Sequence, residues 1–450
     1  MFDKQSWLKQ AEIVSRVLEK AEEFDKDYLL PPEEFVQRQE KTLEMLRKEG
    51  YTCGIVYSDE HYCGDVPYLA GNCNIIVEPI AAVIAPKGLY FIAGLESGIV
   101  AEQFCHRSNV HIRKVDIINV DSESYPDDLL RPESIIEEAC GGKPEKIALL
   151  TTKGIFPLGL YNVIKRYVGE ENVADISSQY YRIKYEKSDR EMRLIAESSR
   201  IADYMLEGML RILRPGLRES QVAQWGHAIA RELGADALGF DVMVTAGINN
   251  RTIVARATNA VIKEGDVVHI GVSPKRDGLC GAERASVLCV SDSKDVPEAH
   301  KIWMSFLEEA FEYAVDVFAE IAEKDLSGCV HEKRMIAFYD SKAPELEKKL
   351  GISLPNFNQL KGYVTSHNSG YTECQEFYGA LSCQFNESCA QQLVMMMDVG
   401  VKGFRDTWDD NVIDGLDYLV IEKTMGKFGK RVEVLNKLPL DLQYLVGEGF

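Results

Sequence analysis

The sequence lacks the features of membrane proteins and nucleic-acid-binding proteins. Its apolar runs all fall short of the roughly 20 residues that a bilayer-spanning helix requires. Lys and Arg together number 51 against 71 Asp and Glu, which gives a formal net charge of -20, and no strongly basic patch stands out. Because an acidic chain repels phosphate backbones and anionic lipids, we expect neither a nucleic-acid partner nor a membrane partner.

The sequence also lacks a dense cysteine framework and a secretory signal. Its eleven cysteines are widely spread and form no CxxC motif. Residues 1–7 (MFDKQSW) lead directly into a charged helical pattern, without the apolar segment of a signal peptide. We therefore expect reduced thiols and a cytoplasmic location.

What the sequence does have is material for more than one core, since 46% of its 450 residues are hydrophobic. Helical periodicity predicts helices over residues 4–24 and 33–49. A strand is expected at residues 53–57, and a hairpin closed by Pro-Lys-Gly at residues 80–92. Strands that alternate with helices up to residue 180 indicate a small α/β domain.

The second half repeats an order of paired helices followed by strands. A capping box at Ser188 and Glu191 starts a long helix, which ends before the Pro-Gly pair at residues 215–216. Further helices are predicted over the ranges 219–233, 298–324 and 331–350. Strands are predicted at 242–245, 267–270, 287–290, 363–366, 393–399 and 418–424. This order is typical of an internally duplicated α+β domain.

Five short segments occur in an order and spacing that resemble the creatinase, prolidase and aminopeptidase P superfamily. They are 187–192 (KSDREM), 213–223 (LRPGLRESQVA), 264–268 (EGDVV), 366–370 (SHNSG) and 421–424 (IEKT). The resemblance implies an α+β fold with a C-terminal pita-bread domain preceded by a smaller α/β domain of the creatinase type. The domains would be an N-terminal helical extension (1–34), the smaller domain (35–183) and the pita-bread domain (184–450).

The metallopeptidases of this superfamily hold two metal ions with two Asp, one His and two Glu. On the resemblance, His367 and Glu422 match the His and the last Glu. The two Asp positions fall on Gly271 and Ala282, and the first Glu position falls on Gln375 or Glu376. Because Gly and Ala cannot bind metal, we expect the dinuclear centre to be lost and no cofactor to be bound. The alternative is one divalent transition metal ion, held by a set drawn from His269, Glu283, His367, Glu376 and Glu422.

Residues 282–284 (AER) resemble a segment of creatinase, which hydrolyses a C–N bond without metal and holds its guanidinium substrate with a Glu. That role passes to Glu283. The catalytic His of creatinase has no counterpart in residues 252–256 (TIVAR), so His367 or His269 would transfer the proton. Strand periodicity places His269 on the same face as Gly271.

The sequence thus predicts a hydrolase site with two groups of candidate residues. The catalytic candidates are His367, His269, Glu422 and Glu283. The candidates for substrate contact are Glu376, Gln375, Glu373, Arg284, Tyr371 and Glu78. Glu422 is supported by its own position, since a carboxylate on an apolar strand is costly to bury unless it is paired, protonated or bound to a ligand.

Three functions remain open at this stage. The first is a metal-independent, creatinase-like hydrolase that cleaves a C–N or related bond in a small polar, cationic amino-acid derivative. The second is a mononuclear-metal hydrolase or lyase on the same fold, and the third is an inactive pseudo-peptidase that binds peptides or a protein partner.

The resemblance also implies a homodimer in which the N-terminal domain of one subunit covers the site of the other. Residues 76–79 (IVEP) align with a creatinase segment that inserts a Phe and an Arg into the partner's site. Glu78 would reverse the charge of that segment.

Overall fold

The computed structural model describes residues 3–118 and 130–439, and the contacts within it divide the chain into two units. The smaller unit is formed by Tyr28–Glu186 and Gly370–Tyr378. The larger unit is formed by Met1–Asp27, Lys187–Ser369 and Gly379–Phe450. None of the helices in the described residues combines the length and the apolar character needed to cross a bilayer.

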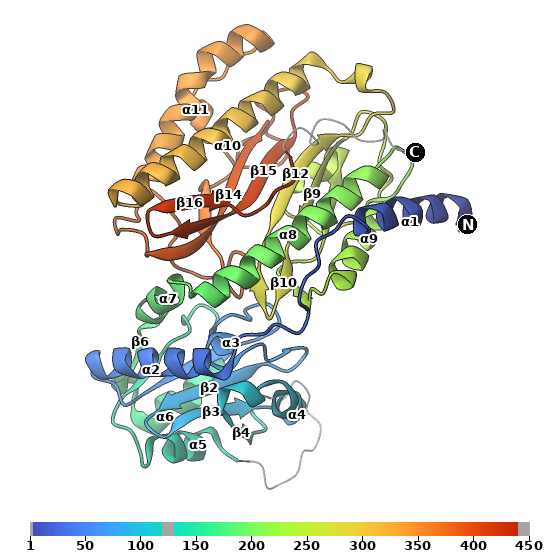
Figure 1. The fold of residues 1–450 in the computed structure, drawn as a ribbon. Helices are drawn as coiled ribbons and strands as arrows, with labels where there is room; N and C mark the ends of the chain where they lie inside the picture. Colours follow the sequence, from blue (N-terminus) through green and yellow to red (C-terminus); the bar gives the residue numbers. More distant parts are fainter. Residues whose placement is uncertain (1–2, 119–129, 440–450) are drawn as a thin grey trace. The chain divides into compact units, whose positions relative to one another are not determined.

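The smaller unit is built on a six-stranded mixed sheet of the described residues, in the order β4-β3-β2-β1-β5-β6 (Figure 1). Its strands are β1 (Cys53–Ser58), β2 (Ile80–Ala85), β3 (Gly88–Ala93), β4 (His111–Lys114), β5 (Ile147–Leu149) and β6 (Val173–Asp175). Its helices are α2 (Pro32–Lys48), α3 (Asp65–Ala70), α4 (Leu95–Phe104), α5 (Pro132–Cys140), α6 (Leu158–Val168) and α7 (Ser177–Tyr185), with 3₁₀ turns η1 (His106–Ser108) and η2 (Glu170–Asn172). The predicted hairpin is confirmed, because β2 and β3 pair antiparallel from Ile80–Ala93 to Ala85–Gly88. Gly88 closes the turn at φ +123°, a conformation that other residues rarely adopt.

The larger unit contains, in the described residues, a seven-stranded sheet in the order β13-β14-β15-β12-β9-β8, with β16 paired to β15. The strands of this sheet are β8 (Met243–Ala246), β9 (Val267–Val272), β12 (Glu283–Leu288), β13 (Ser366–Asn368), β14 (Gln392–Lys402), β15 (Tyr418–Phe428) and β16 (Arg431–Val434). A smaller sheet joins β7 (Ala237–Leu238), β10 (Pro274–Arg276) and β11 (Leu279–Cys280). The helices are α1 (Lys4–Leu18), α8 (Asp189–Ile212), α9 (Glu219–Glu232), α10 (Glu298–Lys324) and α11 (Cys329–Leu350), with 3₁₀ turns η3 (Gly247–Thr252), η4 (Ser293–Asp295) and η5 (Phe357–Leu360).

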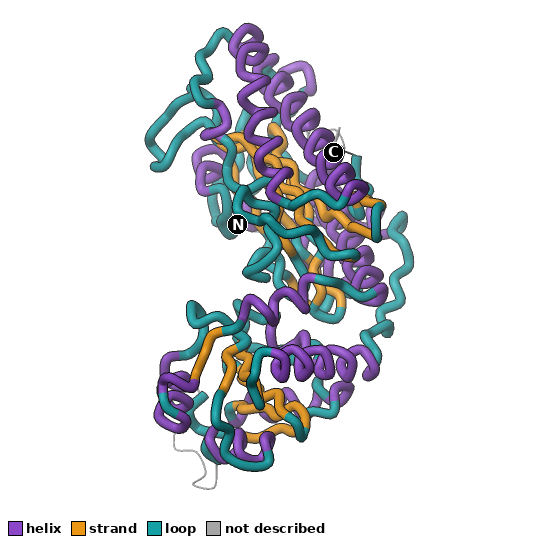
Figure 2. The backbone as a smooth tube through the Cα atoms, turned by 90° about the vertical axis from the view of Figure 1, so that its left-hand side faces the viewer, coloured by secondary structure: helices purple, strands orange, loops and turns teal. Residues whose placement is uncertain are grey.

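Helices flank the strands in each unit (Figure 2). In the larger unit α8 packs on β9 and β12, while α10 packs on β14 and β15 (Figure 1). The predicted start of α8 is confirmed, since the Ser188 side chain accepts from the Glu191 N–H and the Glu191 carboxylate accepts from the Ser188 N–H.

The first helix is shorter than predicted, because α1 ends at Leu18 and residues 19–24 are not helical. The apolar side chains of Ala21 and Phe24 still pack against the core of the larger unit. The backbone N–H of Glu22 donates to the Tyr204 hydroxyl at 3.1 Å. Tertiary contacts rather than helical hydrogen bonds hold residues 19–24 in place. The apolar side chains therefore continue beyond the end of the helix.

Close packing fixes where β12 begins. A Cβ on Gly281 would lie 2.3 Å from the backbone nitrogen of Ser199 in α8, so no larger residue fits there without movement. The Ser198 hydroxyl donates to the Leu279 carbonyl at 2.9 Å and fixes the same approach. The start of β12, which carries Glu283 and Arg284, is therefore held against α8.

Candidate active site

The register of the large sheet brings polar and charged residues from five strands to one face. In its antiparallel ladders Asp398 lies opposite Glu422, Glu422 opposite Arg284, and Arg284 opposite Gly271. Residues directly opposite one another point to the same face, and so do residues two apart on one strand. His367 pairs with Met396, two residues before Asp398, and His269 lies two residues before Gly271. His269, Arg284, His367, Asp398 and Glu422 therefore share one face.

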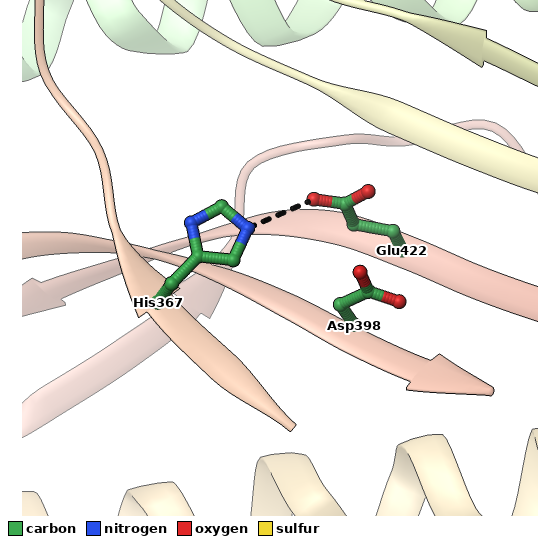
Figure 3. Close-up of side chains that lie close together, drawn as sticks. All are labelled: His367, Asp398 and Glu422. Atoms are coloured by element: carbon green, nitrogen blue, oxygen red, sulfur yellow. Dashed lines mark ion pairs between the residues drawn. The ribbon is translucent and has the colours of Figure 1, made fainter. Parts of the chain in front are cut away.

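His367, Asp398 and Glu422 converge on a common point (Figure 3). One nitrogen or oxygen atom from each lies within 4.8 Å of the others, and no other such group of metal-binding side chains occurs in the described residues. His367 Nε2 lies 3.6 Å from Glu422 Oε1. Both carboxylate side chains are about 1% exposed, whereas the imidazole of His367 is 22% exposed and forms the accessible edge of the group.

The guanidinium of Arg284 is buried among these groups. Its Nη1 lies 2.8 Å from Asp398 Oδ2 and 3.4 Å from Glu422 Oε2. It also donates to the Tyr363 hydroxyl at 2.5 Å and to the Ile253 carbonyl at 3.1 Å. The protein thus supplies its own positive charge between two buried carboxylates.

The electrostatics keep this cation charged. Burial alone would lower the pKa of Arg284, but the neighbouring tyrosines, Asp398 and Glu422 raise it well above its usual value. Burial raises the pKa of Asp398 to about 6, while the guanidinium of Arg284 acts in the opposite direction. With both carboxylates ionised, the two carboxylates and the one guanidinium sum to a formal charge of a single negative unit.

His269 is held as a neutral acceptor. Its Nε2 lies 3.0 Å from Arg284 Nε, and because a guanidinium can only donate, this ring nitrogen must accept. Burial, and then the charge of Arg284, lower the pKa of His269 well below its usual value. The lone pair that a general base would use is therefore engaged by Arg284.

His367 has the geometry of a proton-transfer residue. Its Nδ1 lies 3.3 Å from the Asn368 carbonyl, which can only accept a hydrogen bond. That contact favours a proton on Nδ1 and leaves Nε2 toward Glu422. A carboxylate beside the second ring nitrogen stabilises an imidazolium that forms during proton transfer.

The donor set does not fit a dinuclear metal centre. A Cβ on Gly271 would lie 2.6 Å from Cε of Met243 and 3.1 Å from Cγ of Arg284, so these two side chains crowd the space of a side chain at this position. Ala282 exchanges hydrogen bonds with the Thr424 hydroxyl and offers no ligand. Two of the three remaining donors, Asp398 and Glu422, already pair with Arg284.

Glu283, a predicted catalytic residue, lies on the opposite face of the sheet. It follows the alternation of β12 and is opposite Lys423, whose Nζ lies 2.7 Å from its carboxylate. Burial raises the pKa of Glu283, and Lys423 acts against that shift. Glu283 is adjacent to Arg284 on β12, and adjacent residues of a strand point to opposite faces. The predicted grouping of Glu283 with His367 is therefore wrong.

The predicted substrate-contact residues at 371–376 belong to the smaller unit. Lys184 pairs with Glu376 at 2.9 Å and with Asp65 at 2.7 Å. The Tyr371 hydroxyl accepts from Arg38 at 2.9 Å, whereas Glu373 is buried and Gln375 is half-buried. Of the alternative metal set, Glu376 pairs with Lys184 and Glu283 pairs with Lys423, and the set itself stays a prediction.

Glu78 also has a contact within its own unit. It is buried, and its Oε2 accepts from the Ser97 N–H at 2.8 Å in the first turn of α4. A carboxylate at this place satisfies an N–H group that the helix leaves without a partner and complements the helix dipole.

Asp398 is the site residue that the sequence reasoning missed. It lies within residues 394–401 (VMMMDVGV), an acidic residue on an otherwise apolar strand. Glu422 was singled out by the same signal. The first Glu position was sought instead at Gln375 or Glu376, and the ladder with Glu422 identifies Asp398 as the second acidic residue of the site.

Comparison with known proteins finds similarity to one peptidase family in part of the chain. Residues 193–333 match the model of metallopeptidase family M24. The chain contains an M24 peptidase domain. Among curated proteins it is 21% identical over 230 residues to the uncharacterized peptidase YqhT of Bacillus subtilis (strain 168). That alignment covers 51% of this chain and 63% of the relative, so the chain matches less than two thirds of that protein.

Solved structures show the same fold around the M24 domain. The Xaa-Pro dipeptidase from Bacillus anthracis superposes with a TM-score of 0.67 at 17% identity and covers 91% of this chain and 100% of its own. The N-terminal domain of FACT complex subunit SPT16 from Cicer arietinum superposes with a TM-score of 0.64 at 9% identity, over 92% of this chain and 100% of its own. The predicted fold, a pita-bread domain preceded by a smaller α/β domain, is confirmed.

Proposed function

We propose that this protein is a metal-independent hydrolase of the M24 fold that cleaves a C–N or related bond in a small polar amino-acid derivative. The observation that carries the proposal is the buried Arg284 between Asp398 and Glu422, with the partly exposed His367 beside them. The named M24 relatives are a peptidase and a dipeptidase, which supports hydrolysis of a C–N bond as the reaction class.

In this proposal His367 moves the proton. Its Nε2 takes a proton from the attacking water, Glu422 stabilises the imidazolium, and the same nitrogen returns the proton to the leaving amine. Arg284 pairs with both carboxylates and fixes their positions, which holds Glu422 toward the imidazole. His269 positions Arg284 by accepting from its Nε.

The charge balance of the site supports a substrate with a positive group. Asp398 and Glu422 carry two negative charges against the single charge of Arg284. The remaining negative charge would be balanced by a protonated His367 or by an ammonium or guanidinium group of the substrate. Glu283 does not add to it, since Lys423 pairs with it on the other face.

The test measures turnover of dipeptides, guanidino acids and betaines by protein that has been dialysed against EDTA. We expect turnover to survive the chelator and to fall by about 10²–10⁴-fold in His367→Ala, which is the usual contribution of a general acid–base residue. The control is His227→Ala, because His227 lies on α9 with its side chain 46% exposed. Loss of turnover in EDTA and its return with added metal would favour a metalloenzyme.

A binding function is the second candidate. It is supported by the internal pairing of Asp398 and Glu422 with Arg284 and by the fold shared with a FACT complex subunit. If no compound is turned over but one raises the melting temperature, this second function is favoured.

We further propose that the protein is a homodimer. Ile76 and Val77, next to Glu78, are 59% and 65% exposed, and such apolar side chains are suited to burial against a partner. Sedimentation of wild-type protein and of a variant with both residues changed to Ser tests the dimer.

A further inference from the structure

We propose that the thiols of Cys53 and Cys140 in the smaller unit form a modification site, which a small-molecule disulfide such as oxidised glutathione converts into an intramolecular disulfide bond. This inference concerns thiol chemistry alone and does not depend on the proposed hydrolase activity.

The first step is the position of the two cysteines. Cys53 begins β1, which lies between β2 and β5, and Cys140 is the last residue of α5, which packs on β2 and β3. Cys53 belongs to the hydrophobic core of the smaller unit, and Cys140 packs against the same core. The backbone N–H of Lys87, in the turn between β2 and β3, donates to the Ala139 carbonyl at 3.1 Å. The end of α5 is therefore fixed to the sheet beside the cysteine of β1.

The second step is the contact between the two side chains. A hydrogen bond between the thiols lowers the pKa of Cys140, and the same hydrogen bond, together with burial, raises the pKa of Cys53. The thiolate, which is the nucleophile in disulfide exchange, is therefore favoured at Cys140. Sulfur atoms that already contact one another meet the main geometric requirement of a disulfide bond, which is the close approach of the two side chains.

The third step is access. Cys53 is fully buried, whereas Cys140 is half-buried at the end of its helix. A Cβ on Gly142, two residues further on, would meet no atom within 4 Å, so the chain beyond Cys140 borders open space. An oxidant therefore reaches Cys140 first, and it reacts with Cys53 only through Cys140.

The chemistry consists of two successive exchanges. The Cys140 thiolate attacks one sulfur of oxidised glutathione, which forms a mixed disulfide and releases one glutathione thiolate. The Cys53 sulfur then attacks the Cys140 sulfur, which forms the Cys53–Cys140 bond and releases the second glutathione with the proton of Cys53. Two electrons pass from the protein to oxidised glutathione, so no further oxidant is needed.

The experiment maps disulfide bonds in the full chain. The protein is reduced, freed of reductant, treated with increasing oxidised glutathione and blocked with N-ethylmaleimide, and it is then digested without reductant for mass spectrometry. We expect a pair of peptides joined through Cys53 and Cys140. In Cys53→Ala the mixed disulfide with glutathione should accumulate on Cys140, and in Cys140→Ser the thiol of Cys53 should stay reduced.

The matched control is a second cysteine pair of the smaller unit. Cys73 and Cys105 are also joined by a hydrogen bond between their side chains, but both are fully buried. We expect at least about tenfold less cross-linking of this pair at the same oxidant concentration, because neither thiol is accessible. Equal cross-linking of the two pairs would overturn the proposal, since access at Cys140 would then not decide which pair reacts.

Wild-type protein alone also tests the proposal, so the result does not depend on the folding of a variant. Glutathione on Cys140 without a bond to Cys53 would contradict it, and so would two reduced thiols in protein whose exposed Cys374 has reacted. The oxidised protein should melt at the same temperature as the reduced protein or higher, because the cross-link constrains the unfolded chain. A lower melting temperature would show that the bond forms only in a distorted structure, and the proposal would fail.

Discussion

Each of the two units contains a buried cation between two carboxylates. In the smaller unit Lys184 lies 2.7 Å from Asp65 and 2.9 Å from Glu376. In the larger unit Arg284 lies 2.8 Å from Asp398 and 3.4 Å from Glu422. The formal charge of the two clusters is the same, so charge alone does not distinguish a structural cluster from a functional one.

The difference lies in what else contacts the carboxylates. In the Lys184 cluster, neutral groups of the protein complete the hydrogen bonds. The Thr151 hydroxyl donates to Asp65 at 2.7 Å, and the N–H and hydroxyl of Thr372 both donate to Glu376 at 3.0 Å. The Arg284 cluster instead includes the imidazole of His367, which is 22% exposed, and a buried Asp398 oxygen that receives no hydrogen bond from the described residues.

This comparison shows that burial of paired charges is weak evidence for function. A satisfied cluster holds segments together, and here it ties residues 370–378 to α7 and α3 within the smaller unit. A cluster with an exposed titratable member can exchange protons with solvent or a ligand. The predictions below test whether the two clusters differ in this way.

The largest effect is expected from Lys184→Met. Removing this cation leaves Asp65 and Glu376 buried without the charge of Lys184, which should lower the free energy of unfolding by about 3–5 kcal/mol. Chemical denaturation at pH 7 measures the change. The matched control is Lys165→Met in the same unit, whose partner Glu170 is 62% exposed, and we expect a change of about 1 kcal/mol or less.

Most of the fold could be predicted from the sequence because periodicity and turn chemistry are local. The helix over 298–324 has the predicted bounds, and the capping box at Ser188 starts α8 as expected. The end of α1 was missed because Ala21 and Phe24 are spaced as in a helix but pack against the core without being helical. Their contacts are with residues far away in the sequence, which a local pattern does not show.

The site was harder to predict because it depends on register. His367 and Glu422 were selected correctly as members of one group, but Asp398 joins them only through the ladder between β14 and β15. Glu283 was placed beside them although strand alternation directs it toward Lys423. Arg284 was expected to contact substrate, and a sequence does not show which buried carboxylate an arginine will meet.

A pH effect of intermediate size is expected from Asp398. Burial raises the pKa of its carboxyl to about 6 in the folded protein, above the usual value of 3.8. The folded state therefore binds a proton more tightly than the unfolded state between about pH 4 and pH 6. Stability from this group should increase as the pH falls through that window, by about 3 kcal/mol at most.

The measurement is the free energy of unfolding of wild type and of Asp398→Asn between pH 4 and pH 7.5. The difference between the two proteins should change with pH in the stated direction, since the amide does not titrate. Burial also raises the pKa of Asp65, so Asp65→Asn serves as the matched comparison in the other cluster. A pH-independent difference between wild type and Asp398→Asn would contradict an elevated pKa at this residue.

The smallest effect is expected at Glu78, a buried carboxylate that contacts the N-terminus of a helix. Its Oε2 accepts from the Ser97 N–H at 2.8 Å, and Glu78→Gln keeps an oxygen that can accept the same bond. We expect the free energy of unfolding to fall by about 1 kcal/mol or less, and by more in Glu78→Ala, because the alanine leaves the N–H without its acceptor. Turnover of any identified substrate should not change in Glu78→Gln. Loss of turnover with unchanged stability would instead assign Glu78 to substrate binding, and the carboxylate would then act beyond its contact with α4.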